Sequence, residues 1–393
     1  MGSGDTRQAA PTRAERSPWP VVARGAAALA VAMGIGRFVY TPILPLMHAQ
    51  AGLSSQLGAT LATANYIGYF LGAVAGTLAP GLLRSVLALR GSLILLVASV
   101  GLMAVTTDGA VWFALRLVAG IASALVFVIA VSAVLVRLRE HGKHLVGWVF
   151  GGVGAGIALS GLLVLLLRSV AGWQAAWWAS AALAAVLTVV AWPLRPPAPA
   201  AAAGDGPVVR AAPPHRLFAA LFVAYFGEGV GYIIAGTFLV AAIEQGLPGW
   251  VGSGAWVLVG LAALPSSALY AALGRRWSTP TLLLAALLIQ AVGIALPALL
   301  DGVVPALVSA VLFGATFLGV ASIALAIGTE LRYPRAVALL TAGYSVGQIL
   351  GPLVVTPLLG HGYQQALLVG TGIVLAAAVA ATALRLGWAR RPG

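Results

Sequence analysis

Three ionisable side chains lie deep inside long apolar stretches of this sequence: Arg37, Arg116 and Glu228. A charge at the centre of a membrane-spanning helix costs about 2.5–3.5 kcal/mol, so each of them requires a partner or a function. A guanidinium presents a planar fork of donors that suits a carboxylate or another anion. A carboxyl can carry a proton, because its protonation responds to its access to water and to a nearby arginine. These residue types predict anion binding at Arg37 and proton coupling at Glu228.

Structural alternatives exist for each of these residues. Arg37 and Glu228 could form a fixed ion pair, or Arg37 could bond to carbonyl groups freed near Pro42 and Pro45. Glu228 could also bind a substrate without carrying a proton. Arg116 has two possible roles as well, a structural one and a place in the proton relay.

Polar and aromatic side chains recur beside these charges in the same apolar stretches. Tyrosine suits a binding site because it combines apolar area with one hydrogen-bonding tip. Many such residues within membranes instead join neighbouring helices. The substrate-binding residues that we predict are Arg37, Tyr40, Asn65, Tyr66, Tyr69, Tyr232, Tyr344 and Gln348.

Long apolar helices must position these side chains. Of the 393 residues, 61% are hydrophobic and 8% are charged, whereas a soluble domain has about 25% charged residues. Runs of about 20 apolar residues are long enough to span a bilayer. Twelve such runs are predicted, at 21–47, 57–79, 87–105, 111–136, 148–167, 173–194, 217–240, 254–273, 281–299, 303–327, 336–359 and 363–386. The composition excludes soluble enzymes and predicts an all-α, polytopic membrane protein.

The distribution of basic residues gives the orientation of the predicted spans. Of the 22 basic residues, 19 fall on one side of the membrane, and Arg168 alone falls in a connection on the other side. Arg37 and Arg116 lie within spans. Because lysine and arginine concentrate in cytoplasmic loops, both termini are predicted to be cytoplasmic. The net charge of +13 therefore reflects topology, and we do not expect nucleic acid as a partner.

The chain divides into two similar parts. A shift of 195 residues places Gly34 and Gly36 on Gly229 and Gly231, and it also places Gly152 and Gly156 on Gly347 and Gly351. Parallel repeats of this kind form the two halves of some transporters. The predicted organisation is a disordered cytoplasmic arm (1–20), a six-helix bundle (21–194), a cytoplasmic linker (195–216), a second six-helix bundle (217–387) and a cytoplasmic tail (388–393).

Several motifs resemble those of the major facilitator superfamily. Arg116-Leu-Val-Ala-Gly120 is similar to the RxxxG signature of its fourth helix, and Gly347-xxx-Gly351-Pro352 is similar to its helix-packing glycine motif. The string Gly34-Ile-Gly-Arg-Phe-Val-Tyr-Thr-Pro-Ile-Leu-Pro resembles the YbfB/YjiJ family. The chain departs from the superfamily where a GxxxDRxGR-type motif is expected, because 76–80 and 274–276 contain no acidic residue.

This resemblance implies a fold of twelve transmembrane helices in two six-helix halves, and a secondary active transporter that works by alternating access. We expect a proton-coupled carrier of a small organic anion or zwitterion in a bacterial inner membrane. The alternative is a proton-driven exporter of hydrophobic drugs or toxic metabolites. A single intramembrane carboxylate argues against a membrane-embedded enzyme. A non-transporting sensor or scaffold would tolerate neutral replacement of Arg37 and Glu228.

The expected partners are the solute, protons and the lipid bilayer. The chain has no cysteine and five scattered histidines, so neither a metal nor a cofactor is expected. A monomer is expected, and an enzyme is not.

Overall fold

The computed structural model describes residues 17–139, 141, 144–196, 214–247 and 249–390. Most of the predicted N-terminal arm (1–20), most of the predicted linker (195–216) and part of the predicted tail (388–393) lie outside these residues. Throughout the part that is described, the regular secondary structure is helical and no strand occurs.

The first half of the chain contains α1 (Trp19–Leu29), α2 (Tyr40–Ala51), α3 (Ser55–Leu78), α4 (Val86–Leu102), α5 (Gly109–Arg137), α6 (His144–Leu167) and α7 (Trp173–Ala191). The second half contains α8 (His215–Gly246), α9 (Val251–Leu273), α10 (Thr279–Leu299), α11 (Val303–Glu330), α12 (Ala336–Val355) and α13 (Tyr363–Ala389). A π-helical segment, Ala30–Ile35, and a turn at 36–39 join α1 and α2 into one span, called here the broken span.

Eleven helical segments of the described chain are long and apolar enough to cross a membrane. The helix α3 has 24 residues, which is the length of a twelfth span, but polar residues such as Gln56, Thr60 and Asn65 lower its hydropathy. Each of the twelve predicted spans therefore has a helix as its counterpart. Large apolar side chains such as Leu87 and Val379 stay exposed on the outside of the bundle, as expected for a surface in contact with lipid. The protein is a multi-pass membrane protein.

The repeat seen in the glycines extends to the whole bundle. Shifting the residue numbers by 195 carries α3 onto α9, α5 onto α11 and α6 onto α12, within a few residues at each end. Equivalent glycines also pack in equivalent ways. A methyl group on Gly152 of α6 would lie 2.1 Å from the carbonyl oxygen of Ala26 in α1, and one on Gly347 of α12 would lie 2.7 Å from the carbonyl oxygen of Phe226 in α8.

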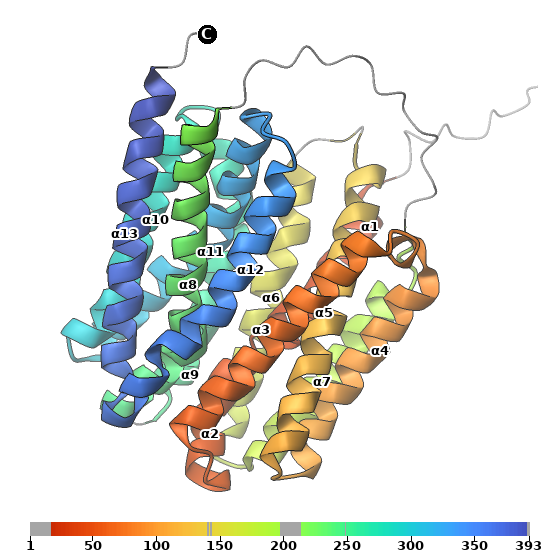
Figure 1. The fold of residues 1–393 in the computed structure, drawn as a ribbon. Coiled ribbons are helices and arrows are strands. Elements are labelled where there is room, and N and C mark those ends of the chain that lie inside the picture. Colours follow the sequence, from red (N-terminus) through yellow and green to blue (C-terminus); the bar gives the residue numbers. More distant parts are fainter. Residues whose placement is uncertain (1–16, 140, 142–143, 197–213, 248, 391–393) are drawn as a thin grey trace, which may run out of the picture.

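Glycines also bring the two halves together. Figure 1 shows α8–α13 gathered on one side and α1–α7 largely on the other, with α6 between them. A methyl group on Gly154 of α6 would lie 2.4 Å from the amide nitrogen of Leu264 in α9, and one on Gly260 would lie 2.2 Å from that of Ala158. The backbones of α6 and α9 therefore meet directly, with no room for side chains between them.

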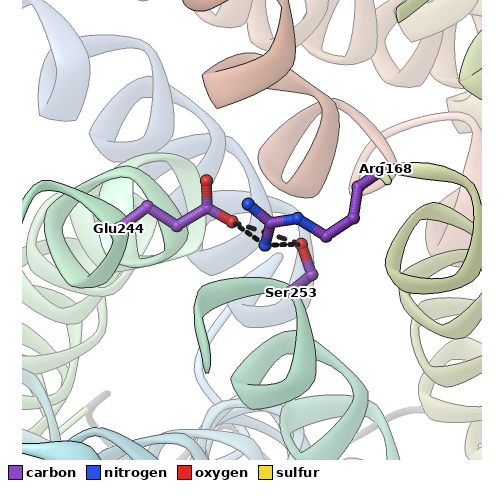
Figure 2. Close-up of polar contacts among 3 residues, drawn as sticks. All are labelled: Arg168, Glu244 and Ser253. Carbon is purple, nitrogen blue, oxygen red and sulfur yellow. Dashed lines mark hydrogen bonds and ion pairs between the residues drawn. The ribbon is translucent and has the colours of Figure 1, made fainter. Parts of the chain in front are cut away.

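The two ends of the bundle differ. We call the end where α7 finishes and α8 begins the linker end, and the opposite end, where α2 finishes and α9 begins, the far end (Figure 1). At the far end, Nη1 of Arg168 lies 2.9 Å from Oε1 of Glu244 and donates to Oγ of Ser253 at 3.3 Å (Figure 2). The hydroxyl of Tyr363 in α13 pairs with Nε2 of His48 in α2 at 2.6 Å. Polar contacts thus join the two halves at the far end.

Candidate functional site

A cavity of about 420 Å³ lies between the two halves. Its 23 lining residues come from the broken span and from α3, α5, α6, α8, α9, α11 and α12. On α8 the cavity is lined by Tyr225, in the first part of that helix, and by Tyr232, near its middle, and on α11 by residues from 317, near the middle, to 325, in the last part. The cavity thus extends from the middle of the bundle toward the linker end. The cavity therefore lies on the linker side of the contacts that join the far end.

Arg37 is the one charged residue among the described residues that line this cavity. Its Nη2 donates to Oε1 of Gln348 at 2.9 Å, and Nε2 of Gln348 in turn donates to the hydroxyl of Tyr232 at 2.6 Å. Its Nη1 contacts only the sulfur of Met33, at 3.9 Å, and Nε has no hydrogen-bond partner. The guanidinium is 4.3 Å from the ring centre of Tyr69. Arg37 is thus held in place while part of its hydrogen-bonding capacity is unused.

No carboxylate of the described chain forms an ion pair with Arg37. The ion pair found among the described residues joins Arg168 and Glu244 at the far end. Its positive charge is met by an amide oxygen and by aromatic faces, although only 2% of the residue is exposed. Burying a charge without an opposite charge is costly. The electrostatics of the cavity therefore favour an anion.

Proline explains why the broken span departs from α-helix just before Arg37. Pro42 has no N–H to donate to the carbonyl of Phe38, and this carbonyl accepts instead from the amide of Thr41 at 3.3 Å. The amide of Gly36 donates to the carbonyl of Val31 at 2.8 Å, in the π-helical pattern. The carbonyl of Arg37 therefore lacks its helical donor, the amide of Thr41.

Arg116 of α5 and Asn65 of α3 satisfy the carbonyls at this break. Arg116 donates from Nη1 to the carbonyl of Gly36 and from Nη2 to that of Arg37, both at 3.3 Å. Nδ2 of Asn65 lies 3.0 Å from the carbonyl of Arg116 and 3.5 Å from that of Gly36. Both side chains are almost fully buried. They support the backbone that holds Arg37.

Glu228 lies on α8 outside the cavity wall and is fully buried. Its Oε1 accepts from Nε2 of Gln290 in α10 at 3.2 Å. Its Oε2 makes no hydrogen bond of ordinary geometry within the described residues, although Tyr344 is near enough to interact with the carboxyl electrostatically. Because Tyr344 lines the cavity, it lies between the cavity and Glu228.

Aromatic rings of the second half stack along the cavity. The ring centres of Tyr225 and Tyr344 are 4.2 Å apart, those of Tyr344 and Tyr232 5.5 Å, and those of Tyr232 and Phe317 6.1 Å. The planes of successive rings differ by 13°, 10° and 5°. Offset stacking of this kind is favourable and gives this side of the cavity an ordered aromatic surface.

The structure brings together half of the predicted site residues. The cavity is lined by Arg37, Tyr69, Tyr232, Tyr344 and Gln348. The others, Tyr40, Asn65, Tyr66, Glu228 and Arg116, lie behind its wall. The hydroxyl of Tyr40 donates to the carbonyl of Gly58 at 2.9 Å, and that of Tyr66 pairs with Oγ1 of Thr237 at 2.8 Å.

Several residues of the cavity are not among those predicted. They include Met33, Phe38, Phe127, Phe150 and Phe317. At helical spacing, a phenylalanine of a cavity wall cannot be distinguished from one of a packed core. Gln290, the partner of Glu228, could have been identified as a polar contact from the sequence, because an amide within a predicted span needs a polar neighbour.

Comparison with known proteins agrees with this architecture. A mutant of the nucleoside transporter NupG superposes with a TM-score of 0.70 at 14% identity, over 93% of this chain and 99% of that chain. A second NupG structure gives a TM-score of 0.65 at 15% identity, over 93% and 98%. At this level of identity the likeness shows the fold, which is the major facilitator fold. No curated protein matches the chain in sequence.

The profile of the family described as "Uncharacterised MFS-type transporter YbfB" matches residues 29–382, nearly the whole described bundle. The matched region begins at the end of α1 and includes the break, the cavity and the buried Glu228. The protein is a member of this family of transporters.

Proposed function

We propose that this protein is a proton-coupled secondary transporter of a small organic anion, or of a zwitterion that presents a carboxylate. The observation that carries this proposal is Arg37, the charged residue of the cavity wall, which has no acidic partner in the described chain. Nε of Arg37 is buried and has no hydrogen-bond partner, and a solute carboxylate can compete with Gln348 for Nη2. The anion then supplies the opposite charge that the cavity lacks.

Alternating access between two bundles, 21–194 and 217–387, fits the positions of the cavity and of the inter-half contacts. The cavity lies toward the linker end, while Arg168–Glu244 and His48–Tyr363 join the far end. We assign the linker end, with both termini, to the cytoplasm of a bacterial inner membrane on the distribution of basic residues. The structure then corresponds to an inward-facing state.

We assign proton coupling to Glu228. This carboxyl is fully buried, and one of its oxygens lacks a hydrogen-bond partner in the described chain. Tyr344 separates it from the cavity and stacks on Tyr225 and Tyr232. A small movement of the Tyr344 ring would expose Glu228 to the cavity, so that solute binding and proton exchange can be linked. Arg116 supports the backbone of Arg37 and has no contact with Glu228 that suggests a proton relay.

Transport by the purified full-length chain in proteoliposomes tests the role of Arg37. A panel of organic anions, zwitterions and neutral solutes is applied, and charge movement and luminal pH are recorded, with protein-free liposomes as the baseline. The Arg37→Gln protein should lose at least about tenfold in affinity for an anionic solute, because a charge-assisted hydrogen bond is lost. Unchanged anion transport by this variant would refute the assignment.

The role of Glu228 is tested by the dependence of transport on a pH gradient. Glu228→Gln should remove accumulation driven by the gradient and retain exchange of solute for solute, because the variant cannot release a proton. The control is Asp301→Asn, an exposed acid in the connection between α10 and α11 that joins no contact between the halves. If Glu228→Gln keeps the wild-type response to pH, the proton is carried elsewhere.

The runner-up function is export of hydrophobic compounds. The apolar part of the cavity wall, which includes Val131, Val153 and Leu325, is the observation that favours it. A neutral hydrophobic solute transported equally well by wild-type and Arg37→Gln protein would support this alternative and contradict anion transport.

A further inference from the structure

Aromatic side chains are concentrated in the cavity wall. Eight of its 23 lining residues are Phe or Tyr, whereas aromatic residues make up 8% of the chain. A cavity that only needs an apolar surface can be built from Leu, Ile and Val. The excess of rings therefore indicates a ligand that interacts with ring faces and edges.

These rings form two walls on opposite halves of the protein. The wall of the second half is the stack of Tyr225, Tyr344, Tyr232 and Phe317. The wall of the first half contains Tyr69, Phe127 and Phe150, whose successive ring centres are 6.5 and 6.1 Å apart and whose planes are tilted by 58° and 69°.

The two walls meet at one place. The ring of Phe38, beside Arg37, contacts Phe317 edge-on with centres 6.0 Å apart. Among the described rings that line the cavity, Phe38 and Phe317 are the pair from opposite halves that contact each other. The other rings of the two walls line the same cavity from opposite halves, so a flat solute in the cavity can contact rings of both halves.

The wall of this cavity carries a single charge. Arg37 is the one charged lining residue that the structure describes, and its Nε has no partner. Its guanidinium also lies over the ring of Tyr69, at 4.3 Å. One carboxylate would satisfy this group, and a second negative charge would be desolvated without a partner.

Hydroxyl groups also line the cavity. The hydroxyl of Tyr232 already accepts from Gln348, and those of Ser267 and Ser322 lie 3.4 Å from each other. Further hydroxyls belong to the rings of Tyr69, Tyr225 and Tyr344, so these side chains offer a hydrogen-bonding tip together with an aromatic face.

We infer that the solute is a flat aromatic monoanion, which places its carboxylate on Arg37 and its ring between the walls formed by Tyr69 and Phe127 on one half and Tyr232, Tyr344 and Phe317 on the other. This inference rests on the proposed function, since it names the class of solute for the same cavity. The ring provides contact with both halves, and the single charge fixes its orientation.

Binding of four matched probes to the purified full-length protein tests the inference, by titration calorimetry at pH 7. Benzoate should bind. Cyclohexanecarboxylate, with the same charge and a saturated ring, should bind about 5- to 100-fold more weakly, because two aromatic contacts are lost. Benzamide, without the charge, should bind at least about tenfold more weakly, and the dianion phthalate should also bind at least about tenfold more weakly.

A change in the wall should affect only the preference for a ring. Phe317→Leu is expected to reduce the ratio of benzoate to cyclohexanecarboxylate affinity to less than about threefold. The matched control is Phe238→Leu, a buried phenylalanine of α8 that contacts Tyr363 and does not line the cavity; it should leave the ratio unchanged. The comparison of probes on the wild-type protein needs no variant, so poor folding of Phe317→Leu would not prevent the test.

Equal binding of benzoate and cyclohexanecarboxylate, equal binding of benzoate and benzamide, or no binding of benzoate overturns the inference. Transport is measured separately with benzenesulfonate, which stays ionised and does not cross lipid as a neutral acid. If only a non-aromatic anion is transported with dependence on Arg37, the class of solute is wrong and the transport function stands. If benzoate binds in the expected order but no solute crosses proteoliposomes, the class stands and the transport function is wrong.

Discussion

The broken span and α8 occupy equivalent positions in the two halves, yet only one of them is interrupted. Both carry a pair of glycines, Gly34 and Gly36 in the first and Gly229 and Gly231 in the second. The broken span changes to π-helix and then to a turn, whereas α8 is a continuous helix of 32 residues. Glycine alone therefore does not cause the interruption.

Proline and the neighbouring helices account for the difference. Pro42 and Pro45 have Thr237 and Val240 at the positions 195 residues later, so α8 keeps its backbone donors. Arg116 and Asn65, which bond to the carbonyls of the break, have Val311 and Gly260 at their equivalent positions. A break within a membrane thus requires both the loss of a donor and side chains that replace it.

Introducing proline into α8 gives the largest expected effect. Thr237→Pro should lower the free energy of unfolding in detergent by about 3 kcal/mol or more, because the residue equivalent to Arg116 is Val311, whose side chain cannot donate to the freed carbonyls. The reciprocal change, Pro42→Thr, should alter it by less than about 1 kcal/mol. Thr237→Val is the control for the lost hydroxyl contact with Tyr66. If Thr237→Pro is as stable as Thr237→Val, our explanation of the difference is wrong.

The equivalent glycines of α6 and α12 should differ in their tolerance of a methyl group. Gly152→Ala should destabilise the protein by about 2–3 kcal/mol, because the new carbon would lie 2.1 Å from the carbonyl oxygen of Ala26. Gly347→Ala, with its nearest atom at 2.7 Å, should cost about 1 kcal/mol, since alanine also favours helix. Thermal unfolding monitored by tryptophan fluorescence compares the two variants, and equal midpoints would contradict this ranking.

Removing the arginine that supports the break should have a smaller net effect. Arg116→Leu leaves the buried carbonyl of Arg37 without a donor, at about 1–3 kcal/mol, and leaves that of Gly36 with only the long contact to Asn65, but it also removes a buried charge, which offsets part of the loss. We expect a net destabilisation of about 2 kcal/mol in the same unfolding measurement. Val311→Ala, at the equivalent position of α11, is the control and should change stability by about 0.5 kcal/mol or less. A stabilised Arg116→Leu protein would show that these bonds are dispensable.

The smallest effect is expected at the equivalent positions 37 and 232, which both contact Gln348. Tyr232→Phe removes the acceptor for the Gln348 amide and keeps the ring, so solute affinity should fall about fivefold, for the loss of about 1 kcal/mol. Calorimetric titration with benzoate measures this change. A loss as large as that of Arg37→Gln would mean that Tyr232 binds the solute directly.

The sequence was sufficient to predict the helices and the repeat, since hydropathy, charge and glycine spacing are all local signals. It also indicated that carbonyls near Pro42 and Pro45 would need a donor. The donor is Arg116 and not Arg37, a choice that depends on how α5 is positioned against the broken span. Depth along a helix can be counted from the sequence, but the direction of a side chain toward a cavity or a neighbour cannot.

The same reasoning explains why five of the ten predicted site residues line the cavity and the other five do not. Tyr69 and Tyr66 are three residues apart on α3, yet Tyr69 reaches the cavity while Tyr66 bonds to Thr237. A fixed ion pair between Glu228 and Arg37 was one alternative from the sequence, but Glu228 contacts Gln290 instead. Phe127 and Phe150 show the opposite case, because they are ordinary apolar residues until the fold places a cavity beside them.

The bond between Arg37 and Gln348 has a consequence for how firmly cargo can be held. A neutral oxygen of Gln348 already accepts from Nη2 of the guanidinium, so the carboxylate of the proposed solute would gain only the difference between two acceptors. Gln348 could bond to Nη2 again when that solute leaves, and the guanidinium would then not be left without an acceptor. The proposed solute would therefore be held moderately and released readily.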